Sequence, residues 1–325
     1  MDKAAQALVY TGPGTAEIAA IDPGPRPEGH VTVRTRYSAL SRGTERLVFE
    51  GRVPEAEYGR MRAPHQVGDF PFPVRYGYAA VGEVIAGPDS LLGRDVFSLV
   101  PHQSVFHVPE AAAIAVPDDV PAPRAVLAAN METALNAIWD AEVSPGIRCL
   151  VVGAGLVGWL ITAGLARRKD LMIALTDVRP ESGINAADFR VNFMSPDEIA
   201  PQSFDIVFHT SASAAGLQTA IDALDFEGTV IELSWYGDCP VEVSLGGNFH
   251  ANRLKLISSQ VGHVAAPRRA AMDYRGRLTR AMAALEDARL DALITQEVAF
   301  TNLPREIARL LGPGAPGIAT RIVYD

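Results

Sequence analysis

The sequence predicts an α/β protein of two domains, one rich in β-strands and one built on a doubly wound parallel sheet. The first third of the chain is rich in Val, Gly and Pro, and its short apolar runs are separated by turn residues. From about residue 122, apolar strands alternate with helical segments, which is typical of a parallel sheet with crossover helices. A length of 325 residues is sufficient for two domains.

The strands of the first third follow from Val-rich runs between Gly and Pro turns. They are expected at residues 7–10, 29–36, 78–85, 95–100 and 104–108. The middle of the chain is predicted to have strands at 149–152, 171–176, 204–208, 228–233 and 254–258, and helices at 123–141 and 156–168. Right-handed crossovers between such strands give a doubly wound sheet.

The end of the chain is predicted to return to the first domain. A helix at 277–288 and two strand-like stretches, at 298–300 and 319–324, follow the last strand of the parallel sheet. We therefore expect one domain to contain residues 1–121 and 268–325, with the second, residues 122–267, inserted into it.

The composition restricts the class of partner. A net charge of −9 disfavours binding to a nucleic-acid backbone. The two cysteines, Cys149 and Cys239, are too few for a disulfide scaffold or for a zinc site built on several thiolates. The eighteen uncharged residues at 149–166 are only marginally long enough for a membrane span, and the first ten residues lack the apolar core of a signal peptide. We therefore expect a cytoplasmic protein that does not contact a membrane.

The strongest local motif is a G-x-G-x-x-G pattern between a predicted strand and a predicted helix. Gly153 allows a tight turn, Gly155 allows the backbone to approach a pyrophosphate, and Gly158 allows the helix to pack closely on the strand. The helix starts with Leu156 and Val157, so its free N–H groups and positive dipole end face the phosphates. The pattern predicts a dinucleotide site, and the alternative is a buried glycine-rich turn without a ligand.

An acidic residue at the end of the next strand supports a dinucleotide site. Asp177 lies 24 positions after Gly153, close to the offset of about 20 at which a carboxylate binds the adenosine ribose. This carboxylate repels a 2′-phosphate and therefore favours NAD. Arg179 can pair with a 2′-phosphate, which keeps NADP open, or it is a solvated loop arginine.

Three further motifs follow one another along the chain. They are Ala-Leu-Val-Tyr-Thr-Gly-Pro-Gly at 7–14, Ser-Arg-Gly-Thr-Glu at 41–45 and Pro-Val-Arg-Tyr-Gly-Tyr-Ala-Ala-Val-Gly-Glu-Val at 73–84. In this order, and over essentially the whole chain, they resemble the medium-chain dehydrogenase/reductase superfamily, which includes zinc alcohol dehydrogenases and quinone oxidoreductases. The resemblance implies a GroES-like catalytic domain, a Rossmann domain, and a cleft between them for nicotinamide and substrate. It also implies a homodimer formed through the nucleotide domain.

The zinc ligands of that superfamily are replaced in this sequence. By the register of the Gly-Thr-acid motif, the cysteine ligand corresponds to Arg42, and the His-Glu pair corresponds to Tyr78 and Ala79. The third ligand position falls near Ala129 or Asn130. Because the first two positions carry no Cys, His or carboxylate, no catalytic zinc is expected.

The Ser-Arg-Gly-Thr-Glu motif, with Gly-Tyr in place of Gly-His, most resembles the 2-desacetyl-2-hydroxyethyl bacteriochlorophyllide dehydrogenase subgroup. That subgroup oxidises a secondary hydroxyethyl group with NAD. The expected activity is therefore zinc-independent hydride transfer between NAD and a secondary alcohol or its ketone. The alternatives are an NADPH-dependent quinone or enoyl reductase and a catalytically silent NAD-binding protein. The Arg-rich and aromatic loop at 50–72 suits an aromatic or anionic small molecule, or is only a surface loop.

The resemblance also implies cofactor contacts near the ends of the parallel strands, where ligands of open α/β sheets bind. They are Thr133 beside the nicotinamide ring, Ser211 and Ser213 after the strand at 204–208, Trp235 and Tyr236 after the strand at 228–233, and Gln260 after the strand at 254–258. The alternatives are that Thr133 and Ser213 cap helices and that Trp235 packs at a domain interface.

The residues at the vacated zinc positions are the candidates for proton transfer. The resemblance matches Thr44 to the hydroxyl residue that hands a proton to the substrate, and Glu45 to its acidic neighbour. We hypothesise that Arg42 and Tyr78 face one another and that the cation lowers the pKa of the phenol. In this hypothesis Tyr78 bonds the reacting oxygen, Arg42 stabilises negative charge, and Thr44 extends the proton relay. His102 lies just past a strand and is a second candidate acid or base. The alternative is that Arg42 bonds Glu45 or a phosphate while Tyr78 fills space.

Overall fold

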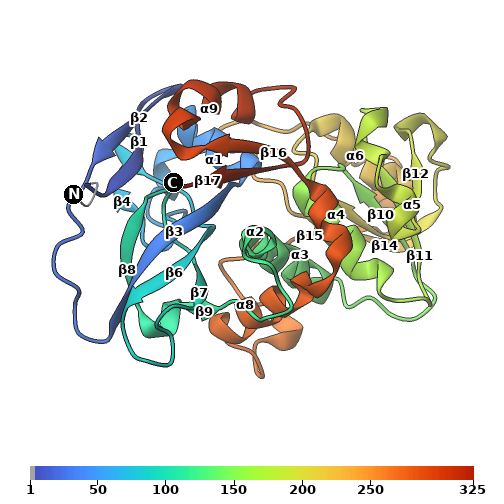
Figure 1. Cartoon of the computed structure of the whole chain (residues 1–325). Helices are drawn as coiled ribbons and strands as arrows, with labels where there is room; N and C mark the ends of the chain where they lie inside the picture. Colours follow the sequence, from blue (N-terminus) through green and yellow to red (C-terminus); the bar gives the residue numbers. More distant parts are fainter. Residues whose placement is uncertain (1–3) are drawn as a thin grey trace. The chain divides into compact units, whose positions relative to one another are not determined.

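The computed structural model describes residues 4–325, which divide into two units (Figure 1). Unit 1 consists of the described residues up to Ala129 together with Ile294–Asp325, and unit 2 is Asn130–Leu293. The chain thus leaves unit 1 once and returns to it at Ile294, later than residue 268, where the sequence places the return.

The segment before Ile294 is joined to unit 2 by one buried polar side chain and by apolar ones. Arg277, on helix α8 (Tyr274–Ala283), is 2% exposed and donates to Glu132 and Asn136 of the same unit. Apolar side chains that follow Arg277 on this helix, such as Leu278 and Met282, are buried as well.

Unit 1 is built on two sheets. A four-stranded sheet has the order β2-β1-β5-β4, and a seven-stranded sheet has the order β16-β17-β3-β6-β7-β9 with β8 paired to β3. The strands are β1 (Gln6–Gly12), β2 (Thr15–Ala20), β3 (His30–Leu40), β4 (Val67–Gly68), β5 (Val74–Arg75), β6 (Ala80–Ala86), β7 (Asp95–Ser98), β8 (Val105–Pro109), β9 (Ile114–Ala115), β16 (Ile294–Ala299) and β17 (Ala319–Val323). The helices are α1 (Arg42–Phe49), η1 (Glu55–Glu57), η2 (Glu110–Ala112), α2 (Ala122–Ala125), η8 (Phe300–Asn302) and α9 (Leu303–Leu311).

The strands predicted for the two ends of the chain are confirmed. The C-terminal β17 pairs antiparallel with β3, so the end of the chain does return to the first sheet. Val31 and Val33 alternate along β3 and are buried against Val84, Val96 and Phe106 of neighbouring strands. This period of two places one face of each strand in the core.

Unit 2 is a six-stranded parallel sheet with helices between its strands. Its order is β12-β11-β10-β13-β14-β15, from β10 (Arg148–Val152), β11 (Met172–Thr176), β12 (Asn192–Met194), β13 (Phe204–His209), β14 (Leu224–Glu232) and β15 (Lys255–Ser258). Its helices, besides α8, are α3 (Ala128–Asp140), α4 (Leu156–Ala166), η3 (Pro180–Gly183), α5 (Ala186–Phe189), η4 (Pro196–Glu198), α6 (Ala214–Ala223), α7 (Asn248–Ala251), η5 (Ala266–Arg268), η6 (Ala284–Glu286) and η7 (Ala288–Leu293). The strand order reverses between β10 and β13, which is the switch point where such sheets bind ligands.

One sequence prediction for this region needs correction, and another is confirmed. The single helix predicted at 123–141 is two helices, α2 and α3, separated by a turn at 126–127. The uncharged stretch at 149–166 is the end of a strand, a glycine turn and the eleven-residue helix α4. Within residues 4–325, no helix has both the length and the apolar character needed to cross a membrane.

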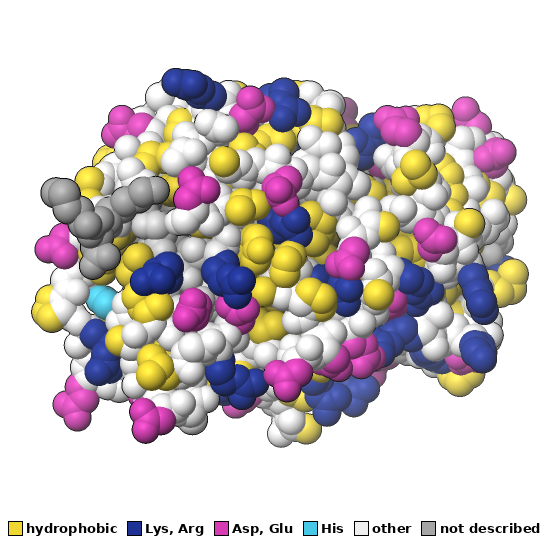
Figure 2. Space-filling view, in the orientation of Figure 1, with side chains coloured by type: hydrophobic (Ala, Val, Ile, Leu, Met, Phe, Trp, Pro, Cys, Tyr) yellow, Lys and Arg dark blue, Asp and Glu magenta, His cyan; other side chains and the backbone are white. Residues whose placement is uncertain are grey.

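Acidic and basic side chains are interspersed over the face shown in Figure 2 rather than separated into patches. Many of them pair across short distances, as Arg36 does with Asp95 at 2.8 Å. Such exposed pairs contribute little to stability, typically less than about 1 kcal/mol each.

Candidate active site

The glycine turn after β10 has the geometry that the motif predicts. Gly153 has a φ of +106°, and a Cβ on it would lie 2.9 Å from the backbone nitrogen of Ser211. A Cβ on Gly158 would lie 1.9 Å from the carbonyl oxygen of Gly153, so only glycine lets α4 approach the strand. Around Gly155, by contrast, nothing lies within 4 Å of the Cβ position. This open space over bare backbone fits a pyrophosphate.

Helix α4 presents its N-terminus at the same turn. Its N-cap is Gly155, which supplies no side-chain cap, and the first helical residues Leu156 and Val157 are partly exposed. An uncapped N-terminus combines free N–H groups with the positive end of the helix dipole. Together with the open space over Gly155, it fits the phosphates of a dinucleotide.

We expect Gly155→Ala to weaken NADH binding by about tenfold or more, a loss of about 1.4 kcal/mol or more, without lowering stability. The added methyl group enters the open space, and the φ of −76° at Gly155 is compatible with alanine. Fluorescence titration and thermal unfolding measure the two effects separately. Gly158→Ala is the matched comparison, since its methyl group collides with the carbonyl of Gly153 and should destabilise unit 2 by about 1–3 kcal/mol. Unchanged NADH affinity in Gly155→Ala would contradict the pyrophosphate assignment.

The structure places Asp177 and Arg179 together beside the turn. One carboxylate oxygen of Asp177 accepts from the backbone N–H of Ala154 at 2.8 Å. The other accepts from the backbone N–H of Arg179 at 2.9 Å and from its guanidinium at 3.2 Å. Asp177 therefore fixes the turn as well as presenting a carboxylate, and Arg179 is paired with it rather than simply solvated.

The residues predicted after the later strands have separate environments. Ser213 accepts from the N–H of Gly216 at 3.0 Å, so the reading of Ser213 as a helix cap is confirmed. Thr133 lies inside α3 rather than at its start, so it does not cap that helix. Trp235 is partly buried, and the exposed Gln260 accepts from the N–H of Gly262 at 2.6 Å.

The sequence reasoning missed two residues at this edge of the sheet. His209 ends β13 and is fully buried, and Glu232 ends β14 beside it, with 2.7 Å between imidazole Nδ1 and carboxylate Oε2. Ser211 lies 2.7 Å from the other imidazole nitrogen, and Tyr236 donates to Glu232 at 3.3 Å. In the sequence, each of these two residues is recognisable only as a polar residue at the end of an apolar strand.

Unit 1 holds the predicted proton-transfer residues. Tyr78, just before β6, donates its hydroxyl proton to Ser41 at 2.5 Å and is also hydrogen-bonded to Thr44. Ser41 immediately precedes α1, and Thr44 lies in its first turn. The Ser-Arg-Gly-Thr-Glu motif and the Gly-Tyr motif therefore meet at one phenol, as the sequence predicts for Tyr78 and Thr44.

The predicted role of Arg42 is not supported by its contacts. Its guanidinium donates to the backbone carbonyl oxygens of Leu310 and of residues 315–317, at distances of 2.7 to 3.3 Å. Arg42 thus ties the start of α1 to the segment that follows α9. A guanidinium that donates to four carbonyl oxygens has most of its N–H groups in use, so it is poorly placed to stabilise charge on a substrate.

The expected fall in the pKa of Tyr78 is also wrong. The pKa of Tyr78 is raised to about 12, mainly by burial; its hydrogen bonds with Ser41 and Thr44 lower the pKa in part, and the negative charge of Glu45 adds a smaller increase. The hypothesis required a nearby cation, and the groups that act on Tyr78 are instead a carboxylate and two hydroxyls. Tyr78 is therefore a neutral phenol at pH 7.

Glu45 and His102 form a buried pair beneath this phenol, and neither is exposed. One oxygen of Glu45 accepts from the backbone N–H of Ser41 at 2.6 Å, and the other from the Tyr10 hydroxyl at 2.9 Å. His102 Nε2 lies 2.9 Å from that second oxygen, and its Nδ1 lies 2.8 Å from the hydroxyl of Ser38. The paired carboxylate stays satisfied out of water, as a buried charge must be.

Gly77 makes room for this pair. It has a φ of +117°, and a Cβ on it would lie 2.8 Å from the ring of His102. The glycine of the Gly-Tyr motif is therefore required by the packing of a histidine 25 positions later in the chain.

The loop at 50–72 contributes aromatic rings rather than free cations. Tyr58, Phe70, Tyr76 and Tyr78 follow one another with ring centroids 5.6, 5.8 and 6.0 Å apart. Its arginines pair with acidic side chains of the same segment, in the pairs Arg52–Glu50, Arg60–Glu57 and Arg62–Asp69.

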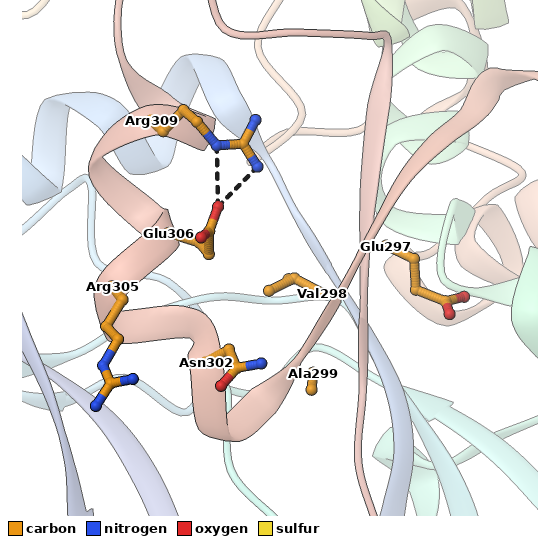
Figure 3. A pocket seen from close by; sticks show the side chains of 7 residues that line it. All are labelled: Glu297, Val298, Ala299, Asn302, Arg305, Glu306 and Arg309. Atoms are coloured by element: carbon orange, nitrogen blue, oxygen red, sulfur yellow. Dashed lines mark hydrogen bonds and ion pairs between the residues drawn. The ribbon is translucent and has the colours of Figure 1, made fainter.

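A hollow of about 420 Å³ in unit 1 lies apart from the residues discussed so far. It is lined by Glu297, Val298, Ala299, Asn302, Arg305, Glu306 and Arg309 (Figure 3). Arg309 donates two hydrogen bonds to Glu306, at 2.8 and 2.9 Å, so its charge is already compensated.

No group of three or more His, Cys, Asp or Glu side chains that could hold a metal ion occurs within residues 4–325. Cys149 is buried, whereas Cys239 is exposed. Burial raises the pKa of the Cys149 thiol to about 12, so this thiol is unreactive at neutral pH.

No protein-family model matches the chain. The chain is 25% identical over 282 residues to D-guloside 3-dehydrogenase of Escherichia coli K12, an alignment that covers 78% of this chain and 80% of that protein. Its structure matches that of 2R,3R-butanediol dehydrogenase from Bacillus subtilis with a TM-score of 0.78 and 15% identity, over 99% of this chain and 100% of the other. It also matches an alcohol dehydrogenase from E. coli CFT073 complexed with NADH, with a TM-score of 0.75 and 13% identity, over 99% and 100% of the two chains. The chain therefore has the fold of the medium-chain alcohol dehydrogenases, a GroES-like part and a Rossmann part.

Proposed function

We propose that this chain is an oxidoreductase that transfers hydride between NAD and a secondary alcohol or its ketone, without zinc. The observation that carries the proposal is the Tyr78 phenol, bonded to Ser41 and Thr44 where the resemblance places zinc ligands. The resemblance of residues 41–45 to bacteriochlorophyllide dehydrogenases supports the same chemistry. The fold shared with alcohol dehydrogenases supports the reaction class.

In this proposal, nicotinamide supplies the hydride chemistry and the protein manages binding and one proton. The turn at Gly155 and the N-terminus of α4 hold the pyrophosphate. In alcohol oxidation, the Tyr78 oxygen accepts the proton of the substrate hydroxyl while its own proton passes to Ser41, and Ser41 releases its own hydroxyl proton to solvent. A neutral phenol that accepts one proton as it releases another needs no large change in charge, which suits a pKa of about 12.

The substrate we propose is a neutral molecule with several hydroxyl groups. The guloside and butanediol dehydrogenases found by comparison are both named for compounds of this kind. The arginines of the loop at 50–72 are paired within the loop, which weakens the earlier expectation of an anionic substrate. Among the rings of this segment, the partly exposed Tyr58, which packs on the buried Phe70, offers an apolar face for a sugar or an aromatic aglycone.

The test is an assay of purified protein with NAD against secondary alcohols, including butane-2,3-diol, hexitols and glycosides. We expect NADH formation with at least one of them, and unchanged rates after chelator treatment. Activity that requires added zinc would contradict the zinc-free proposal. Reduction of quinones or enones with NADPH, and no alcohol oxidation, would support the reductase alternative instead.

Replacing Asp177 tests the preference for NAD. We expect Asp177→Ser to weaken NADH binding by about tenfold and to improve NADPH binding, because the carboxylate that binds the ribose and repels a 2′-phosphate is lost while Arg179 remains. Parallel fluorescence titrations with NADH and NADPH measure the shift. Asp170→Ser is the control, since this exposed carboxylate pairs with Arg168 at the start of β11. A wild type that binds NADPH as tightly as NADH would contradict the assignment.

We also propose a homodimer that forms at the edge of the parallel sheet. β15 is the last strand of the sheet order, and its Leu256 and Ile257 are 44% and 40% exposed. An unpaired edge with apolar side chains is a surface that a second copy can cover. Sedimentation should show a dimer for the wild type and a monomer for Leu256→Glu, with Met172→Glu, at another exposed apolar position, as the control. A monomeric wild type at micromolar concentration would contradict the dimer.

A further inference from the structure

Five polar side chains at the ends of β13 and β14 form one continuous hydrogen-bonded chain. The carboxylate of Glu232 lies 2.7 Å from Nδ1 of His209, and Nε2 of His209 lies 2.7 Å from the hydroxyl of Ser211. The hydroxyl of Ser211 lies 3.0 Å from that of Ser213. Tyr236 donates to the same Glu232 oxygen at 3.3 Å. His209 is fully buried, whereas Ser211 is exposed.

These contacts determine where the protons are. Glu232 also accepts from the backbone N–H of Ser234 at 2.7 Å, so its carboxylate is an acceptor for every group around it. A neutral His209 therefore carries its proton on Nδ1, and its bare Nε2 accepts the hydroxyl proton of Ser211. Ser213 already accepts from the N–H of Gly216, so its own proton is directed to Ser211.

The Ser211 oxygen is left with one unused lone pair. It donates to His209 and accepts from Ser213, and a hydroxyl oxygen has two acceptor positions. Because Ser211 is exposed, this lone pair is available to a ligand. The buried histidine and glutamate thus convert an ordinary serine, which can donate or accept, into one that only accepts.

Ser211, the acceptor, lies next to the glycine turn that follows β10. Thr210 donates to the carbonyl oxygen of Gly153 at 2.9 Å, and a Cβ on Gly153 would lie 2.9 Å from the backbone nitrogen of Ser211. Gly216 leaves the room that the arrangement needs, since a Cβ there would lie 2.1 Å from the Ser211 oxygen.

The same order of groups also occurs in enzymes with a nucleophilic serine, and the surroundings argue against that reading. Such a serine needs nearby N–H groups that are free to stabilise an oxyanion. Here the N–H of Ala212 donates to Ser234 at 3.1 Å, and that of Gly216 donates to Ser213. Both amides are therefore already used within the chain of contacts.

We propose that Glu232 and His209 are positioning residues that fix Ser211 as a hydrogen-bond acceptor for a donor group of the bound dinucleotide, a ribose hydroxyl or the carboxamide amino group. The inference rests on the proposed function, since it concerns the cofactor of that reaction. It gives a role to two residues, His209 and Glu232, that are not part of the glycine motif.

The experiment is a set of NADH titrations at pH 8 on the full chain. We expect Ser211→Ala, His209→Gln and Glu232→Gln to bind NADH about tenfold more weakly than the wild type. Ser203→Ala is the control, because its hydroxyl lies at the opposite end of β13 and bonds the carbonyl oxygen of Pro201.

Two further measurements separate the remaining outcomes. With reduced 3-acetylpyridine adenine dinucleotide, which lacks the amide N–H, the Ser211→Ala effect disappears if the donor is the carboxamide and persists if it is a ribose hydroxyl. Labelling of Ser211 by a fluorophosphonate would overturn the inference by showing a nucleophile. So would equal NADH affinity of wild type, Ser211→Ala and His209→Gln, a result that leaves the proposed function intact. A wild type that binds neither NADH nor NADPH would instead overturn the proposed function itself.

Discussion

Tyr78→Phe is expected to lower kcat/KM for alcohol oxidation by about 10²- to 10⁴-fold, the usual contribution of a positioned acid or base. The phenyl ring retains the contact with Tyr76 but loses the hydroxyl that bonds Ser41 and Thr44. NADH affinity should change by less than about twofold, because the glycine turn belongs to unit 2 and does not use this hydroxyl. Steady-state kinetics and a fluorescence titration of the same preparation measure both quantities.

Tyr76→Phe is the matched control for this variant. It removes a hydroxyl from the neighbouring ring and keeps the ring contacts with Phe70 and Tyr78, so kcat/KM should stay within about tenfold of the wild type. A Tyr78→Phe enzyme with full turnover would contradict the role of the phenol.

The raised pKa of Tyr78 also predicts how the effect of Tyr78→Phe on the rate depends on pH. A phenol with a pKa of about 12 keeps its proton below pH 11, so the ratio of wild-type to Tyr78→Phe rates should be constant from pH 7 to pH 10. A phenol with a lowered pKa would instead make this ratio change within that range. The ratio therefore tests the correction to the sequence-based hypothesis directly.

Arg277→Met is expected to destabilise unit 2 by about 3–5 kcal/mol, because it leaves Glu132 as an unpaired buried charge. The two side chains are 3% and 6% exposed, and their Nε–Oε1 distance is 2.9 Å. Arg277 also donates to the carbonyl oxygens of Val261 and His263, so the segment that carries Gln260 loses two contacts. Urea unfolding followed by tryptophan fluorescence reports on this unit, since Trp139, Trp159 and Trp235 all belong to it.

The defect should be larger at pH 8 than at pH 5. Burial raises the pKa of Glu132 even with Arg277 beside it, so removing Arg277 raises it further. A carboxyl group whose pKa is raised in the folded state loses stability as the pH rises from its unfolded value through the folded one. Arg280→Met, on the exposed face of the same helix, should stay within about 0.5 kcal/mol of the wild type. Equal stability of the two variants would show that the buried pair contributes nothing.

Most strands and helices could be predicted from hydrophobic periodicity and turn residues, because each depends mainly on the residues within its own segment. The strands of β3 and β10 are recognisable from their own residues, as period-two alternation and as a short apolar run. The boundary of the second unit was not predictable in this way. It depends on Arg277 reaching Glu132 across 145 positions of sequence, and no local pattern encodes such a contact.

The same distinction between local motifs and long-range contacts applies to the candidate site. The glycine turn and the meeting of Tyr78 with Thr44 could be predicted, because each rests on a motif with a fixed spacing. The pKa of Tyr78 could not, since it depends on burial and on the charge of Glu45 rather than on the position of Arg42 in the motif. His209 and Glu232 were missed because they are adjacent only after β13 and β14 pair side by side.

The rate of NAD reduction by a secondary alcohol, in protein whose metal content has been measured after chelation, decides whether the reaction needs zinc. We expect turnover with NAD in preference to NADP at well under one zinc ion per chain, and no gain when zinc is added. Turnover that appears only with added zinc, or only with NADP, would contradict this expectation.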